Sequence, residues 1–377
     1  MLFEGTDVRD GKYKRVTVEN GYIKNIELLG EKENNDYLSV GFTDMQVNGF
    51  LGIDYSGENL TVEDIAKLND ALVKKGTLHH VPTIITNSKE RIIENLKIIA
   101  QAVKENEFLR ASIVGIHVEG PFIAQKDGPR GAHDPLFVRD PSVEEVKEWQ
   151  AAANGLIKII TIAPEKKGAV EFTKEVSKMG INVAIGHCEP TDEELDAVIE
   201  AGARLSTHLG NGSSALLPRL KNHIWKQLAD DRLTTGIISD GFHLPKSVLL
   251  ADYRTKGIDK LVLVSDVALL GGLKPGLSKW GNIDVEICAD GHLALPSTSL
   301  LAGAGHLLDW DLRVFREATG CTLKEAIQCV TDNPSKVLGV KVSAIKVGEK
   351  ADLIQFEEGQ ERIVLKAWAL GDASERK

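Results

Sequence analysis

The chain has 377 residues, a length that accommodates one (β/α)8 barrel of about 250 residues together with a smaller second domain. Hydrophobic residues make up 42% and charged residues 27%, a balance that excludes a disordered or fibrous protein. The formal net charge of -10 disfavours nucleic acid as a partner, because phosphate backbones are bound by clustered lysines and arginines.

The N-terminal string MLFEGTDVRDGKYKR has no basic stretch followed by an apolar run, so it lacks the pattern of a secretory signal. No segment reaches the roughly 18 uninterrupted apolar residues that a membrane span requires. We therefore expect a cytoplasmic protein with no membrane partner. The cysteines are scattered and form no CxxC pair, so we expect them to be reduced: Cys188, Cys288, Cys321 and Cys329.

From residue 40 to about residue 267, short β-branched runs alternate with amphipathic helical patterns, as in parallel strands joined by helical crossovers. There are eight such runs, the number of strands in a (β/α)8 barrel of the TIM type. The expected strands are Val40–Asn48, Gly76–Ile85, Ala111–Glu119, Ile157–Ala163, Asn182–His187, Arg204–His208, Thr235–Asp240 and Leu261–Asp266.

Capping patterns mark the helices between these strands. A serine or threonine hydroxyl can satisfy a free backbone N–H at a helix start, and an acidic residue three positions later can reciprocate. Residues 88–103 repeat apolar side chains at helical spacing, so we expect this helix to lie outside the barrel with one stripe buried. The pairs that fit the capping pattern are Thr61 with Asp64, Ser142 with Glu145, Thr191 with Glu194, and Thr322 with Glu325.

The two ends of the chain contain short alternating strands, separated by Asn-Gly and Glu-Gly turn signals. We expect these ends to pair into one small β-sandwich domain. It would comprise residues 1–40 and 344–377, and the barrel would comprise residues 41–343. The strands expected in the small domain are Arg15–Val18, Tyr22–Leu28, Leu353–Phe356 and Arg362–Trp368.

Residues able to bind a metal stand at the C-terminal ends of four expected strands. They are Glu119 in IVGIHVEGPF, His187 in VAIGHCE, His208 in RLSTHLGNG and Asp266 in LVLVSDV. The C-terminal strand ends of such a barrel converge at one mouth, so these side chains are expected to meet. Together they suit a catalytic divalent metal with an open position for water. A lone histidine or aspartate at a strand end is more often structural, but four at one mouth indicate a site.

Other histidines also lie on expected strands. His79 and His80 are neighbours on the second strand, so alternation points one toward the interior and the other toward a helix. We expect packing roles for both. His117 alternates with Glu119 and is expected to point inward, without an assigned role.

The strand-end motifs resemble those of the N-acetylglucosamine-6-phosphate deacetylases, a family of the amidohydrolase superfamily. GFTDMQVNGFLGIDYS resembles their first-strand motif, and HVEGPF followed by GAHDPLFV resembles their third-strand segment. IGHCEPT, STHLGN and SDGFH resemble their motifs at strands five, six and seven. NPSKVLGV and VGEKADLI resemble closing segments of many amidohydrolases. The resemblance spans almost the whole chain, in order.

Carried over position by position, the resemblance implies that Glu119, His187 and His208 are the metal ligands and that Asp266 is the catalytic acid/base. It also implies a homodimer, in which an arginine from one subunit binds a phosphate in the neighbouring site. An exposed loop position is the alternative for the two histidines among the substrate contacts. The implied substrate contacts are His133, Asn211, Gly212, Arg219 and His243.

Strand one departs from a common amidohydrolase pattern. Many members carry His-x-His there to hold a second metal, whereas this chain has Gln46-Val47-Asn48. Neutral amide oxygens bind zinc-like ions less strongly than imidazole, so one divalent metal ion is expected. Zinc is the expected ion, and iron, cobalt and manganese also accept a glutamate with two histidines.

The segment GNGSSALLPRL after His208 is glycine-rich, but it lacks the spacing and the Lys-Ser/Thr pair of a P-loop. Its backbone amides and Arg219 could hold an anion, and the alternative is a mobile loop with a surface arginine. This segment and VALLGGLKPGLSKW after the eighth strand both differ from the family pattern. Because such loops line a barrel's pocket, the preferred sugar can differ while the chemistry persists.

The expected function is metal-dependent removal of the N-acetyl group from an amino sugar, giving acetate and the free amine. The resemblance implies N-acetylglucosamine 6-phosphate as the substrate. One alternative is an amidohydrolase that acts on another N-acyl or cyclic amide substrate. The other is a barrel that binds a small sugar without turnover, since fold alone does not imply function. Retention of all four metal and acid/base positions argues against that last alternative.

Overall fold

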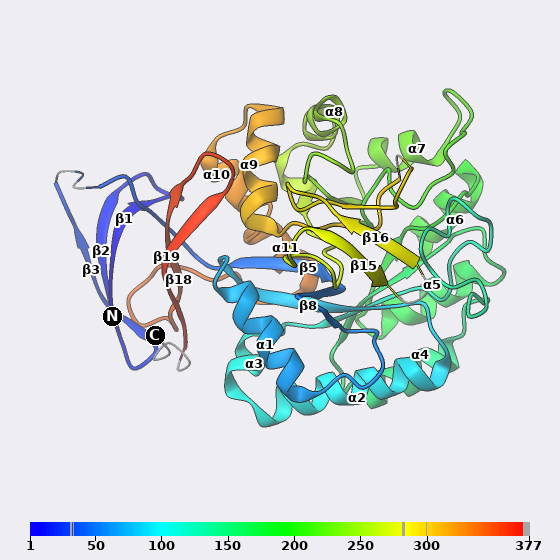
Figure 1. The fold of residues 1–377 in the computed structure, drawn as a ribbon, viewed down its shortest axis with the longest axis horizontal. Helices are drawn as coiled ribbons and strands as arrows, with labels where there is room; N and C mark the ends of the chain where they lie inside the picture. The colour runs from blue at the N-terminus through cyan, green and yellow to red at the C-terminus, as the bar shows by residue number, and fades with distance from the viewer. Residues whose placement is uncertain (31, 33, 281–282, 299, 372–377) are drawn as a thin grey trace.

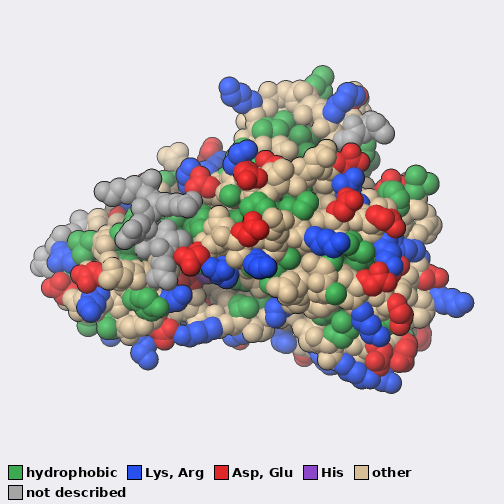
Figure 2. All heavy atoms as spheres, turned by 90° about the horizontal axis from the view of Figure 1, so that it is seen from below, with side chains coloured by type: hydrophobic (Ala, Val, Ile, Leu, Met, Phe, Trp, Pro, Cys, Tyr) green, Lys and Arg blue, Asp and Glu red, His purple; other side chains and the backbone are tan. Residues whose placement is uncertain are grey.

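The structure is a computed structural model that describes residues 1–30, 32, 34–280, 283–298 and 300–371. It has a barrel surrounded by helices and, at one side of the barrel, a smaller sheet that contains the first and last strands of the chain (Figure 1). None of the helices in the described ranges is both long and apolar enough to cross a membrane. Acidic and basic side chains are interspersed over the face seen in Figure 2, so this face presents no large surface of one charge.

Eight strands, parallel to their neighbours, form the barrel, and they are arranged in chain order. A parallel bridge between Val47 and Val267 connects the first strand to the segment after the last, so the sheet closes on itself. The expected (β/α)8 architecture is thereby confirmed. The strands are β5 (Phe42–Val47), β8 (Thr77–Ile85), β9 (Ile116–Glu119), β10 (Ile157–Ile162), β11 (Asn182–Ile185), β12 (Leu205–Ser206), β13 (Thr234–Ile237) and β14 (Leu261–Leu263).

The third strand starts later than its sequence predicts, and the expected start at Ala111 is wrong. Residues Glu107–Ser112 form the short helix α3 instead. Asn106 begins this helix, because its side chain accepts hydrogen bonds from the backbone N–H groups of Phe108 and Leu109. An apolar run is compatible with either a strand or a buried helix, and here the cap at its start favours the helix.

The helices pack around the outside of the barrel, and each of the four expected hydroxyl caps is present. The acid three residues later reciprocates to the backbone only in the pairs Thr191 with Glu194 and Thr322 with Glu325. In α2, Ile92, Leu96 and Ile99 are fully buried in the cluster between helices and strands, as the periodicity predicted. The helices are α1 (Val62–Val73), α2 (Lys89–Glu105), α4 (Val143–Ala152), α5 (Ala169–Lys178), α6 (Asp192–Ala201), α7 (His223–Ala229), α8 (Lys246–Lys256), α9 (Leu308–Thr319), α10 (Leu323–Gln328) and α11 (Asp332–Leu338).

The two ends of the chain join in a six-stranded sheet, which closes over its own apolar cluster around Phe3, Val16 and Leu38. The hairpin of the last two strands also packs against the barrel, because Ile354 and Phe356 belong to a cluster with Phe42 of β5. In spatial order, the strands are β19 (Ile363–Leu370), β18 (Asp352–Glu358), β4 (Tyr37–Ser39), β1 (Leu2–Asp7), β2 (Tyr13–Glu19) and β3 (Tyr22–Leu28).

A three-stranded sheet, which was not predicted from sequence patterns, follows the eighth barrel strand. It consists of β15 (Gly276–Trp280), β16 (Ile283–Ile287) and β17 (Leu293–Ala294). A small hairpin, β6 (Gly49–Phe50) with β7 (Ile53–Asp54), follows the first barrel strand. The loops of the first and eighth strands are hydrogen-bonded to each other, from Leu51 N to Gly271 O and from Gly52 N to Leu269 O.

Candidate metal centre and active site

The three expected metal ligands converge at the mouth of the barrel. The Nε2 atom of His208 lies 2.9 Å from Glu119 Oε1, and the Nε2 atom of His187 lies 3.2 Å from the same oxygen. The two Nε2 atoms are 3.1 Å apart. All three residues are buried, with exposed fractions of 2% for Glu119, 8% for His187 and 2% for His208.

This donor set fits a divalent transition metal. In a tetrahedral zinc site with ligands at about 2.0–2.1 Å, neighbouring ligand atoms are about 3.3 Å apart, close to the separations seen here. His133 offers an alternative third ligand, because its Nε2 lies 3.3 Å from His187 Nε2 and it forms a compact set with Glu119 and His187. We favour His208, since its Nε2 atom lies near the ligand atoms of both Glu119 and His187.

The ring of His187 is oriented by its own loop neighbours. Its Nδ1 lies 3.0 Å from the backbone carbonyl oxygen of Pro129, to which it can only donate. The hydrogen bond places the proton on Nδ1 and leaves the Nε2 lone pair directed at the cluster. Gly212 packs so closely on the ring that a Cβ there would lie 2.7 Å from Nδ1, and its φ is +58°. Gly212, expected as a substrate contact, therefore supports a ligand in this structure.

The backbone at the strand ends is strained at three of the expected site residues. His187, His208 and Asp266 have φ values of 51°, 27° and 50°, in the left-handed region that residues with a Cβ rarely occupy. Barrel strands β11, β12 and β14 end just before them. The left-handed turn explains why the strands are shorter than expected, and such strain is frequent at functional sites.

Two side chains that the sequence suggested only as poor metal ligands contact the site's acids. The amide of Gln46 donates to Glu119 Oε1 at 3.1 Å, and the amide of Asn48 donates to Asp266 Oδ1 at 2.7 Å. From the sequence, Gln46 and Asn48 were interpreted only as replacements for the His-x-His pair that holds a second metal. Gln46 and Asn48 alternate along the first strand, so both side chains face the barrel mouth. That alternation was the signal that could have predicted their contacts with Glu119 and Asp266.

The charges in the cluster are strongly coupled. Burial raises the pKa of Glu119, but hydrogen bonds and charge from His187 and His208 outweigh burial and hold that pKa well below its usual range. For His208, burial lowers the pKa, and Glu119 more than compensates and raises it to about 9. A positive charge is therefore favourable beside Glu119, which is the sign of charge that a divalent cation brings.

Asp266 lies at the edge of this cluster and is half-buried. Burial raises its pKa above the ordinary value, and the charge on His208 opposes that rise. A carboxyl group with a raised pKa is better suited to exchange a proton near neutral pH than an exposed aspartate. The geometry thus brings the expected acid/base group to the expected ligands.

His133 and His243 stand at the mouth beside the cluster. The Nδ1 of His133 lies 2.8 Å from the hydroxyl of Thr86, and burial lowers the pKa of His133 to about 3, so its ring is neutral. The Nδ1 of His243 donates to the Asp240 carboxylate at 2.7 Å. Asp240, which the sequence analysis did not single out, also accepts from the backbone N–H of His243 and fixes the ring. Neither histidine is a surface position: His133 is buried and His243 is half-buried.

The remaining expected substrate contacts lie on the loop after β12. Asn211 is half-buried close to His208, whose carbonyl oxygen accepts its backbone N–H. Arg219 is exposed farther along the loop. The same loop exposes Leu216 at 91% and Leu220 at 79%. Among the described residues, no hydrogen bond or ion pair joins Arg219 to the metal cluster of its own chain.

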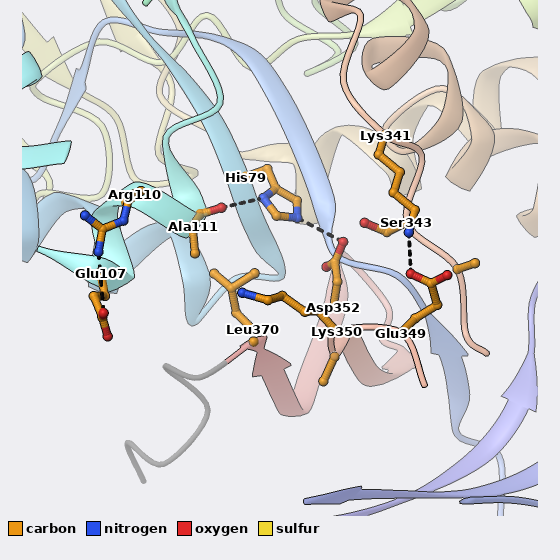
Figure 3. Close-up of a pocket in the computed structure, with 13 residues that line it drawn as sticks. His79, Glu107, Arg110, Ala111, Lys341, Ser343, Glu349, Lys350, Asp352 and Leu370 are labelled. Carbon is orange, nitrogen blue, oxygen red and sulfur yellow. Dashed lines mark hydrogen bonds and ion pairs between the residues drawn. The ribbon is translucent and has the colours of Figure 1, made fainter. Parts of the chain in front are cut away.

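The other histidines have structural surroundings. His80 Nε2 lies 2.8 Å from the Tyr55 hydroxyl, and His117 points inward and lies 2.7 Å from the Thr161 hydroxyl. His79 lies at the opposite end of the barrel, where it lines a cavity of about 500 Å³ between the barrel base and the terminal sheet. Figure 3 shows that cavity, with His79 between the Ala111 carbonyl and Asp352. None of the expected site residues lines it.

The sequence is similar to known proteins over most of its length. Residues 37–373 match the family model described as "Amidohydrolase family". N-acetylglucosamine-6-phosphate deacetylase of Bacillus subtilis (strain 168) is 31% identical over 354 residues, covering 92% of this chain and 87% of that protein. The enzyme of the same name from Caenorhabditis elegans is 31% identical over 335 residues, covering 85% and 79%.

Solved structures give the same fold. The crystal structure of N-acetylglucosamine-6-phosphate deacetylase from Pasteurella multocida has a TM-score of 0.84 and 25% identity, and the match covers 99% of each chain. N-acetyl-D-glucosamine-6-phosphate deacetylase from Mycobacterium smegmatis has a TM-score of 0.85 and 23% identity, with 98% of each chain covered.

Proposed function

The chain belongs to the amidohydrolase family, and from this premise we propose that it removes the acetyl group of an N-acetylated amino-sugar phosphate, with N-acetylglucosamine 6-phosphate as the favoured substrate. The proposal depends on one observation: the Nε2 atoms of His187 and His208 and the Oε1 atom of Glu119 lie within 3.2 Å of one another, beside Asp266. The products would be acetate and the free amino sugar.

In the proposed reaction, Glu119, His187 and His208 would hold one divalent metal, which would supply a Lewis acid and lower the pKa of water at the site. Zinc is favoured, and iron, cobalt or manganese could fill the same ligands. Asp266 takes the proton of the attacking water and later delivers it to the departing nitrogen. The Asn48 amide, which donates to Asp266 Oδ1, orients the carboxylate for this exchange.

The two further histidines suit roles in binding. His133 is neutral, and when its Nδ1 accepts from Thr86 its Nε2–H is free to donate to the acetyl carbonyl oxygen as negative charge develops there. Asp240 holds the proton of His243 on Nδ1, so that Nε2 of His243 can accept from a sugar hydroxyl.

Phosphate recognition is proposed to depend on a homodimer. Arg219 is exposed on a loop that also exposes Leu216 and Leu220, and exposed apolar side chains of this size favour a protein interface. We infer that this loop crosses to a second copy of the chain. There Arg219 would bind the phosphate group as a bidentate pair.

The experiment that tests the function is acetate release from N-acetylglucosamine 6-phosphate by the metal-loaded protein, with metal content measured on the same sample. Unphosphorylated N-acetylglucosamine and an N-acetylated amino acid serve as matched substrates. Release from the phosphorylated sugar at the highest kcat/KM is expected. A higher kcat/KM on the amino acid would assign a different N-acyl substrate, and no release from any of them by metal-loaded protein would refute hydrolysis.

A further inference from the structure

A second cavity, of about 480 Å³, is lined in part by the loops that follow the first and eighth barrel strands. It is formed by the end of α1, the β6–β7 turn, the turn between β16 and β17, the start of α9, and Arg362 before β19. None of the proposed catalytic, metal or substrate residues lines it. It is also separate from the cavity of Figure 3, with which it shares no lining residue.

Two buried polar atoms of residues that line this cavity lack hydrogen-bond partners among the described residues. They are Nε2 of His306 and Oδ2 of Asp309. The exposed fractions are 6% for His306 and 1% for Asp309. Buried polar atoms nearly always have a hydrogen-bond partner, so a pair of unpartnered atoms at one cavity points to a missing partner.

Charge in the cavity is arranged around Asp309. The Nζ of Lys75 and a guanidinium nitrogen of Arg362 each lie 3.7 Å from Asp309 Oδ2, beyond hydrogen-bond length. Both cations are more than one-third exposed, so each can also reach a bound molecule. The other charged groups of the lining are already paired outward, Lys74 with Asp70 and Asp290 with His292. Two cations facing one carboxylate leave a single excess positive charge.

The missing partner must therefore donate hydrogen bonds to Asp309 and bring negative charge to Lys75 and Arg362. Burial lowers the pKa of His306 to about 4, so its neutral ring can accept a hydrogen bond through one nitrogen. An ammonium group has three donors, enough for the Asp309 oxygen and the His306 nitrogen. A phosphomonoester brings about -1.5 to -2 charges at neutral pH, so together with an ammonium group it carries close to one net negative charge.

We propose that this cavity binds a small amine-bearing phosphomonoester, with the ammonium group on Asp309 and His306 and the phosphate between Lys75 and Arg362. The inference rests on the cavity and its charges and does not require the proposed deacetylation. The site adjoins the catalytic mouth through a stack of rings. His306 stacks on Trp310 at 4.2 Å between centroids and on Phe242 at 5.6 Å, and Phe242 precedes His243. A molecule bound there contacts the support of the active site without entering it.

Isothermal titration calorimetry with glucosamine 6-phosphate tests the proposal, with glucosamine and inorganic phosphate as probes that each carry only one of the two groups. The titration uses the full chain carrying His187→Ala, which stops turnover at the mouth, and the cavity is reported by the part of the binding heat that a further change in its lining removes. Lys75→Glu is then added, and Lys67→Glu, at an exposed lysine of α1 outside the cavity, is the matched control, since Lys75 lies just after the end of that helix. Both are surface positions, and thermal melting verifies that the variants fold.

Binding of glucosamine 6-phosphate is expected to survive in the His187→Ala and Lys67→Glu chains. It should weaken at least about tenfold in the Lys75→Glu chain, because a cation is replaced by an anion at the phosphate position. Asp309→Asn should weaken the phosphorylated amine more than inorganic phosphate. No binding in the His187→Ala chain, equal binding with and without Lys75→Glu, or equal affinities for all three probes would each overturn the proposal.

Discussion

Histidine and carboxylate side chains meet at both ends of the barrel, but they meet in different ways. At the base, His79 uses both ring nitrogens, one on the Ala111 carbonyl at 3.1 Å and the other on Asp352 at 2.9 Å. At the mouth, His187 uses Nδ1 on a backbone carbonyl, and its Nε2 faces the Nε2 of His208 and an oxygen of Glu119. Because His187 carries its proton on Nδ1, the lone pair of its Nε2 needs a cation or a donated proton within the cluster.

The histidines at both ends are largely buried, so burial does not distinguish a structural histidine from a metal ligand. The contacts of the two ring nitrogens do. The pair at the base links the second barrel strand to the terminal sheet, since Asp352 begins β18. It should therefore affect stability and leave metal content alone. Changes to the cluster at the mouth should alter metal content and have less effect on stability.

The largest effect is expected for His187→Ala, which should lose the bound metal and reduce acetate release to background, since two ligands hold a divalent ion poorly. His79→Ala is the matched control, as a histidine with both nitrogens engaged. Metal content by inductively coupled plasma mass spectrometry and acetate release are measured together. Full occupancy in His187→Ala, or metal loss in His79→Ala, would remove the distinction between the two ends.

Asp266→Asn tests chemistry against metal binding at the mouth. It should keep most of the metal and lose about 10²–10⁴-fold in kcat, the usual contribution of a positioned acid/base. The Asn48 amide that contacts Asp266 remains as a hydrogen-bonding neighbour, so the loop should keep its shape. A near-normal kcat with metal retained would transfer the role to another group.

At the base, Asp352→Asn should lower the free energy of unfolding by about 3 kcal/mol, because it leaves His79 without its counter-charge in a buried position. Urea unfolding measures the loss, with metal content as the second readout. Metal content should not change. Unaltered stability would show that the pair does not hold the terminal sheet to the barrel.

Arg219→Ala should lower kcat/KM on the phosphorylated sugar by roughly tenfold to a hundredfold, since a hydrogen bond to a charged group contributes about 1.5–3 kcal/mol. The unphosphorylated analogue should be unaffected. Mixing this variant with the Asp266→Asn variant should restore activity if the arginine serves the neighbouring subunit. Absence of recovery after subunit exchange would place Arg219 outside a shared site.

The smallest effect is expected in the pH dependence of the free energy of unfolding that the His79–Asp352 pair produces. Burial lowers the pKa of His79, but Asp352 outweighs it and the net pKa is raised above 6.5. Burial raises the pKa of Asp352, and His79 outweighs it so that the net pKa falls below 3.8. The stabilisation should be complete between about pH 4 and pH 6.5, and it should fade as pH rises through the His79 pKa or falls through that of Asp352. Asp352→Asn should flatten this dependence in urea titrations.

Sequence patterns predicted the barrel, the helix caps and the convergence of Glu119, His187, His208 and Asp266, because each depends on local periodicity or on the shared polarity of parallel strands. They did not predict the sheet β15–β17, whose strands are short and largely exposed and therefore carry little apolar alternation. Nor did they assign Gln46, because its contact with Glu119 joins two distant strands. The contact of Asp240 with His243 is local, but periodicity does not report the hydrogen bonds within a turn. The proposed ligand set itself remains to be tested by the metal measurements above.

The left-handed backbone at His187, His208 and Asp266 has an evolutionary consequence. Residues with a Cβ pay roughly 1 kcal/mol or more to hold such a conformation, whereas glycine adopts it freely. Under selection for stability alone, substitutions to glycine or asparagine would therefore accumulate at these positions. Selection for turnover would instead preserve the present residues. In a lineage that no longer uses the substrate, substitutions are expected first at these three positions. They could therefore identify a gene copy whose product has lost its activity.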